Sequence, residues 1–70
     1  MFANTIKDIL KDSNKSLTQN DLAAVLGMTK QSFSNKMSRD TFTVQDMIKI
    51  ASYLDMTVVL KSADHEYIVQ

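Results

Sequence analysis

The chain has no cysteine, no proline and a single glycine among its 70 residues. The lack of cysteine excludes disulfide bonds and thiolate metal sites. The scarcity of proline and glycine, with no low-complexity stretch, argues against a long disordered linker. A chain of this length forms one domain, so we predict a single domain over 1–70. Its stability must come from close helix packing, from a partner chain, or from both.

Long hydrophobic runs are also missing. No segment approaches the roughly 20 apolar residues that a membrane span needs, and residues 1–5 lack the basic start and apolar core of a signal peptide. We therefore expect a cytoplasmic protein without a membrane partner.

The chain also lacks net charge, because eight basic residues balance eight acidic ones. This balance argues against a non-specific polyanion binder. The charges are unevenly placed, however. Residues 29–49 carry four Lys or Arg against two Asp, whereas residues 50–70 carry one Lys against three acidic residues. Positive charge therefore gathers in the middle of the chain and negative charge at its end.

One pattern occurs three times, over residues 17–22, 28–33 and 42–47: a large apolar residue, a threonine, three further residues and a second large apolar residue. The threonine predicts a helix N-cap, and the two apolar residues have the spacing of a hydrophobic staple. Two copies place a carboxylate, Asp21 or Asp46, where it suits the positive end of the helix dipole. Helices are therefore expected to start at Thr18, Thr29 and Thr43.

Apolar periodicity completes the assignment, which is a mainly α fold with helices over 2–11, 19–26, 30–38 and 44–54. The polar run 12–16 ends the first helix, and Gly27 suits the left-handed turn after the second. The inward residues expected of the first helix are Phe2, Ile6, Ile9 and Leu10. Those expected of the fourth are Val44, Met47, Ile48, Ala51 and Leu54, with Ile50 and Tyr53 off the stripe.

After Asp55 the pattern changes to β-branched and aromatic residues, which predicts a hairpin over 57–70. A loop over 62–65 pairs Lys61 with Glu66, so that opposite charges face each other. The same register pairs apolar residues with apolar residues, namely Leu60 with Tyr67, Val59 with Ile68 and Val58 with Val69.

The third predicted helix has an unusual composition. Its two apolar residues, Phe33 and Met37, lie four positions apart and form a narrow inward stripe. The other side chains, which we expect to face outward, are amides, hydroxyls and lysines, with no carboxylate. Such a surface offers hydrogen-bond donors and acceptors to base edges and no charge that repels phosphate. The alternative is a solvated surface helix, although such helices usually carry carboxylates as well.

Residues 19–37, QNDLAAVLGMTKQSFSNKM, resemble the helix-turn-helix of the phage lambda repressor and Cro family. The most specific part of the resemblance is a set of spaced residues, namely Leu22, Ala23, Gly27, Met28, Thr29 and Phe33. The resemblance covers about 17–54 and implies a four-helix, lambda-repressor-like domain, here with a C-terminal β-hairpin. Residues 34–40 followed by a strand-rich tail are similar to small regulators from bacterial mobile elements.

The resemblance implies a sequence-specific regulator of transcription, more specifically a repressor, that places helix 30–38 in the major groove of double-stranded DNA. The residues that it places at base edges are Lys30, Gln31, Ser34 and Asn35. Those that it places at phosphates are Thr18, Gln19, Lys36, Ser38 and Arg39. The N-terminus of the second helix would add backbone N–H groups.

The sequence departs from the family at two places. Lys36 stands where the family usually has an apolar residue, and Met37 is expected to do that packing, which leaves the rotation of helix 30–38 open. The hairpin replaces a fifth helix, so the family's dimer contacts do not carry over.

The hairpin itself predicts a homodimer. One of its faces, formed by Val58, Leu60, Tyr67 and Val69, can pack on the helices, whereas Val59 and Ile68 lie on the other with nothing to cover them. We therefore expect Val59 and Ile68 at a two-fold interface, and hence a palindromic operator.

The sequence shows no nucleophile–base set, no paired acid–base carboxylates, no metal-ligand spacing and no phosphate loop. We therefore expect no enzymatic activity, no metal and no cofactor, and we expect His65 to be a solvated loop residue. An alternative function, favoured by the zero net charge, is a protein–protein interaction or antitoxin-like adaptor module on the same fold.

Overall fold

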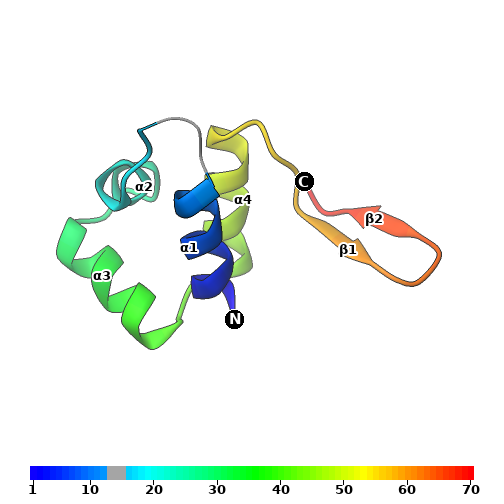
Figure 1. The fold of residues 1–70 in the computed structure, drawn as a ribbon, viewed down its shortest axis with the longest axis horizontal. Helices are drawn as coiled ribbons and strands as arrows, with labels where there is room; N and C mark the ends of the chain where they lie inside the picture. The colour runs from blue at the N-terminus through cyan, green and yellow to red at the C-terminus, as the bar shows by residue number, and fades with distance from the viewer. Residues whose placement is uncertain (13–15) are drawn as a thin grey trace.

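The computed structural model describes residues 1–12 and 16–70, so most of the predicted polar run 12–16 lies outside the described residues. Four helices precede a two-stranded antiparallel sheet (Figure 1). The elements are α1 (Phe2–Asp12), α2 (Gln19–Val25), α3 (Lys30–Arg39), α4 (Val44–Tyr53), β1 (Val59–Lys61) and β2 (Glu66–Ile68). The predicted mainly α fold with a C-terminal hairpin is confirmed. None of the helices within the described ranges is long and apolar enough to cross a membrane.

Three of the helices begin at the predicted threonine caps. The hydroxyl oxygens of Thr18, Thr29 and Thr43 accept hydrogen bonds from backbone N–H groups three residues later, at 3.1–3.2 Å. In α2 and α4 the carboxylates of Asp21 and Asp46 also accept from the backbone N–H of the capping threonine, at 2.9 and 3.0 Å. Both helices therefore have complete capping boxes, which satisfy N–H groups that an uncapped helix leaves without partners.

The turn between α2 and α3 follows the predicted use of glycine. Gly27 has a φ of +69°, and its N–H donates to the carbonyl of Ala24 while the N–H of Met28 donates to that of Ala23, both at 3.0 Å. These two bonds form a Schellman motif, which ends a helix in a left-handed residue. The tight turn holds α2 and α3 in contact as a helix-turn-helix (Figure 1).

The core lies among the four helices and contains the predicted staple residues. The buried members of this core are Ala3, Ile6, Leu22, Ala23, Leu26, Phe33, Phe42, Met47 and Ile50. The rings of Phe33 and Phe42, from α3 and from the segment before α4, lie 5.3 Å apart in a tilted pair. Met28 and Met37 pack against the same cluster, as expected of core-filling methionines.

The predicted stripe of α4 is partly wrong. Ile50, expected off the stripe, is 1% exposed, whereas Val44, expected inward, is 50% exposed. The buried stripe runs through Met47, Ile50 and Ala51 and continues to the half-buried Leu54, which is a regular three- and four-residue spacing. Val44 is the first residue of the helix, beyond the edge of the core, so it stays in solvent.

The hairpin has the predicted register. Val59 pairs with Ile68, Leu60 with Tyr67 and Lys61 with Glu66, and the ammonium of Lys61 lies 3.8 Å from Oε1 of Glu66. Beyond these pairs, the N–H groups of residues 69 and 70 both donate to the carbonyl of Val58, at 2.7 and 3.3 Å. Two residues then face one, as in a β-bulge, and the regular pairing ends there. The predicted pair of Val58 with Val69 is therefore not part of the ladder.

The placement of the hairpin differs from the prediction. It extends away from the helices along the long axis of the molecule, at the opposite end from α2 and α3 (Figure 1). Leu60 and Tyr67, expected to pack on the helices, are 66% and 61% exposed, and Val69 is exposed as well. Val58 is half-buried and packs against the core. The reason for singling out Val59 and Ile68 as the uncovered residues is therefore removed.

Candidate nucleic-acid interface

The outward side of α3 is polar and free of carboxylates. Every residue of α3 other than Phe33, Lys36 and Met37 is exposed. One stripe along the helix is formed by residues three, four and seven positions apart, namely Gln31, Ser34, Asn35 and Ser38. The four residues predicted at base edges, Lys30, Gln31, Ser34 and Asn35, therefore lie together on the solvent side of one helix.

Two amides on this side are joined to each other. Nε2 of Gln31 donates to Oδ1 of Asn35 at 3.3 Å, one helical turn away. Because the hydrogen bond already restricts both side chains, they lose less conformational freedom when they bind a ligand. The remaining donors and acceptors of both amides face solvent, where they suit the bidentate contacts that amides make with adenine.

The inward side of α3 includes a lysine. Lys36 follows Phe33 by three residues, so it lies on the same side of the helix as Phe33 and Met37. Its side chain is 29% exposed, and its ammonium lies 5.9 Å from the centre of the Phe42 ring. The expectation that all residues of this helix other than Phe33 and Met37 face outward is therefore wrong for Lys36.

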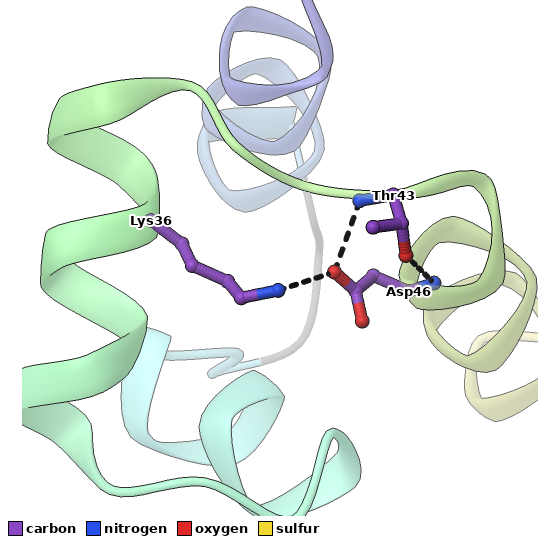
Figure 2. Close-up of polar contacts among 3 residues, drawn as sticks. All are labelled: Lys36, Thr43 and Asp46. Atoms are coloured by element: carbon purple, nitrogen blue, oxygen red, sulfur yellow. Dashed lines mark hydrogen bonds and ion pairs between the residues drawn. The ribbon is translucent and has the colours of Figure 1, made fainter.

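The ammonium of Lys36 has a carboxylate partner on the next helix. Nζ of Lys36 donates to Oδ2 of Asp46 at 2.8 Å, and the same oxygen accepts from the backbone N–H of Thr43 (Figure 2). Asp46 thus serves both the capping box of α4 and an ion pair to α3. The pair links the polar helix to its neighbour and leaves the ammonium directed away from the outward stripe.

The surroundings of Asp46 change its pKa. Burial of the carboxyl group disfavours its charged form, but hydrogen bonds from Lys36 and from the Thr43 backbone, with the Lys36 charge, outweigh burial. The pKa of Asp46 therefore lies below its ordinary value of 3.8. The carboxylate is ionised at neutral pH, so the ion pair is intact under those conditions.

The start of α2 supplies the second part of the predicted interface. Thr18 and Gln19 are exposed there, and the first N–H groups of a helix have no acceptor within the helix itself. N–H groups at the start of a helix attract anions. The backbone N–H of Thr18, however, already donates a hydrogen bond to the carboxylate of Asp21. At the other end of α3, Ser38 and Arg39 are also exposed. Apart from Lys36, the residues predicted at phosphates are accessible.

Sequence reasoning missed the role of Asp40. This residue ends α3 in the left-handed conformation, with a φ of 54°. Its Oδ1 accepts from the backbone N–H of Ala3 at 3.0 Å, and its other oxygen contacts the amino group of Met1. Asp40 therefore joins the end of α3 to the start of α1. An aspartate just after a helix, a residue type that tolerates a positive φ, is the signal that could have indicated the turn.

A family model described as the bacteriophage CI repressor helix-turn-helix domain matches residues 7–59, more than half of the 70-residue chain. The match runs from within α1 to the first residue of β1 and includes the whole helix-turn-helix. No curated protein and no solved structure matches the chain. The matched family is one of DNA-binding regulators and not an enzyme family. The chain belongs to the bacteriophage CI repressor helix-turn-helix family, in agreement with the lambda-repressor resemblance of its sequence.

Proposed function

We propose that this protein is a sequence-specific repressor of transcription that inserts α3 into the major groove of double-stranded DNA. The observation that carries the proposal is the exposed side of α3, which presents amides, hydroxyls and cations without a carboxylate. A DNA duplex repels carboxylates through its phosphates and offers base edges that amides and hydroxyls recognise.

The exposed residues divide into two roles. Lys30, Gln31, Ser34 and Asn35 contact base edges, because they lie on the solvent side of α3. Thr18, Gln19, Ser38 and Arg39 contact phosphates on either side of the groove, with help from the N-terminus of α2.

Lys36 has a different role in this proposal. Its ammonium is held by Asp46 on the inner side of α3, so it fixes the rotation of the helix instead of neutralising a phosphate. The phosphate contacts then rely on few cations. Because each neutralised phosphate adds to affinity and to salt dependence, non-specific binding is weak and the salt dependence shallow.

Two copies of the chain act together on DNA in this proposal, joined through the hairpin. The hairpin is remote from α3, so a dimer formed there leaves both α3 helices free (Figure 1). A two-fold dimer presents them to two half-sites, which makes the operator palindromic. Residues 50–70, with one Lys against three acidic residues, are poorly suited to phosphates and well suited to face away from them.

The proposal is tested by selecting sequences from random duplex DNA at two salt concentrations. We expect enrichment of a palindromic motif, with specific binding that persists at a salt concentration where random DNA is released. Recovery of no motif at either concentration would contradict the proposal. It would favour an adaptor module that binds another protein, which agrees with the zero net charge of the chain.

A further inference from the structure

The hairpin is a two-stranded sheet with little support from the rest of its own chain. The apolar side chains of β1 and β2, from Val59, Leu60, Tyr67 and Ile68, are all exposed, on both faces of the sheet. An isolated two-stranded hairpin is at best marginally stable in water. This hairpin, called the arm below, would therefore be stabilised by packing against another apolar surface.

The helical body has an apolar pocket at the base of this arm. The pocket has a volume of about 270 Å³ and lies between α1, α4 and the segment that leads into β1. It is lined by Phe2, Thr5, Ile9, Met47, Ile50, Ala51, Met56, Thr57 and Val58. Seven of these nine side chains are apolar, and the two polar ones are threonines, so the pocket suits aliphatic or aromatic groups and offers no charge to hold an ion.

Val58 connects the pocket to the arm. It lines the pocket, and by strand alternation it lies on the same face of the hairpin as Leu60, which pairs with Tyr67. The pocket and this face of the arm therefore form one continuous apolar strip. A two-fold axis near Val58 would place the hairpin half of one strip against the pocket half of the other.

The exposed area of the chain agrees with a missing partner. The chain exposes 5164 Å², whereas a folded monomer of 7.9 kDa is expected to expose about 4,400 Å². The excess of roughly 750 Å² is close to the approximately 800 Å² that each partner buries in a stable interface. One further copy of this chain has the size and the chemistry to cover it.

We propose that the pocket between α1 and α4 binds the hairpin of a second copy of the chain, and that the two copies exchange hairpins reciprocally. Leu60 and Tyr67 of each arm lie in the pocket of the partner, while Val59 and Ile68 stay on the outer face. The proposal rests on the homodimer put forward above and specifies its interface. It uses the face of the hairpin opposite to the one that the sequence suggested.

Cysteine cross-linking tests this arrangement, because the chain has no cysteine of its own. A Thr5→Cys chain is mixed with a Leu60→Cys chain and oxidised mildly. Thr5 is exposed and lines the pocket, so its substitution leaves the buried core intact. We expect a covalent heterodimer. The matched control mixes the Thr5→Cys chain with an Ile68→Cys chain, whose new thiol lies on the opposite face of the same hairpin, and we expect little heterodimer from it.

Other outcomes overturn the exchange. Efficient cross-linking of the Ile68→Cys chain to itself, without the heterodimer of Thr5→Cys and Leu60→Cys, would show hairpins that meet face to face. The repressor proposal would survive that result. A wild-type chain that stays a monomer at micromolar concentration, both free and on DNA, would refute any dimer, and the selection from random DNA would then decide separately whether the monomer binds a specific sequence.

Discussion

Nζ of Lys36 on α3 lies 2.8 Å from Oδ2 of Asp46, in the first turn of α4. The Asp46 side chain is 13% exposed, and its Oδ2 also accepts a hydrogen bond from the backbone N–H of Thr43. This second bond holds the oxygen in place independently of the lysine. The pair therefore acts as a fixed link between the polar helix and the body that supports it. We expect this link to help set the direction in which α3 presents Gln31 and Asn35.

The first prediction distinguishes a structural role of Lys36 from a contact between Lys36 and a DNA phosphate. Lys36→Met keeps an unbranched side chain but removes the ammonium, so the free energy of unfolding should fall by about 1–2 kcal/mol. The slope of log affinity against log salt should not change, because no phosphate contact is lost. Arg39→Ala, at an exposed cation on the same helix, should leave the fold intact and reduce this slope by about 1. Equal slope changes in the two variants would show that Lys36 leaves Asp46 when DNA binds.

The second prediction concerns the stability of the fold at acidic pH. Because the pKa of Asp46 is lowered in the folded chain, its ionised form stabilises the fold above the ordinary pKa of 3.8, and this contribution is lost as the pH falls through the folded-state value. Asp46→Asn should therefore destabilise the protein at neutral pH, and the difference from the wild type should shrink in acid below pH 3.8. Urea unfolding at a series of pH values measures this difference.

Asp21→Asn is the control for this pH series, because Asp21 occupies the matching capping box of α2 and has no lysine partner among residues 1–12 and 16–70, which the structure describes. At neutral pH, Asp21→Asn should lower the free energy of unfolding by less than Asp46→Asn does. A difference between the wild type and Asp46→Asn that stays constant into acid would contradict the ionised pair.

The third prediction uses two aspartates in left-handed turns. Asp55, after α4, has a φ of 58°, so Asp55→Gly should remove strain and raise the free energy of unfolding by roughly 0.5–1 kcal/mol. Asp40, with a φ of 54°, is under the same strain, but its carboxylate accepts from the backbone N–H of Ala3. Asp40→Gly should therefore lower the free energy of unfolding, because the lost hydrogen bond outweighs the relieved strain. Thermal unfolding measures both, and equal stabilisation would show that Asp40 does not support α1.

The fourth prediction concerns base recognition. Gln31→Ala removes an amide from the outward stripe and leaves Oδ1 of Asn35 without its donor, so specific affinity should fall by about 1–3 kcal/mol, with relaxed preference at particular base pairs. Gln45→Ala, an exposed amide on α4, is the control and should change neither. Competition binding against single-base variants of the selected operator measures both quantities. If Gln31→Ala binds with unchanged affinity and preference, another surface contacts the bases.

Most of the fold could be predicted because its signals are local. The threonine caps, the glycine turn and the cross-strand pairing of Lys61 with Glu66 each depend on residues a few positions apart. The rotation of α3 was open because Lys36 looks like a solvent-facing residue. Its three-residue spacing from Phe33 indicates the inner side, but its carboxylate partner lies ten residues further along the chain.

The placement of the hairpin had no local signal. Alternation predicts which residues share a face but not which surface that face meets, since the choice depends on packing between distant elements. Leu60 and Tyr67 were therefore assigned to the helices of their own chain, although the structure exposes both. Ile50 was misplaced for a similar reason, because several stripes fit the apolar residues of α4 and only the packed helices select one.

The last prediction joins the hairpin to DNA binding. If two copies bind one operator through a rigid two-fold dimer, the half-sites must lie on the same side of the duplex, which places them one helical turn of about 34 Å, or a multiple of it, apart. Insertion of about five base pairs between the half-sites turns one of them to the opposite side and should reduce affinity to that of a single half-site. Leu60→Lys, at an exposed residue of β1, should cause the same loss on the intact operator and leave single half-site binding unchanged, because α3 is remote from it. Sedimentation at micromolar concentration should show the wild type at twice the monomer mass and Leu60→Lys at the monomer mass. A wild type that binds the intact and the lengthened operators equally well would refute the dimer on DNA.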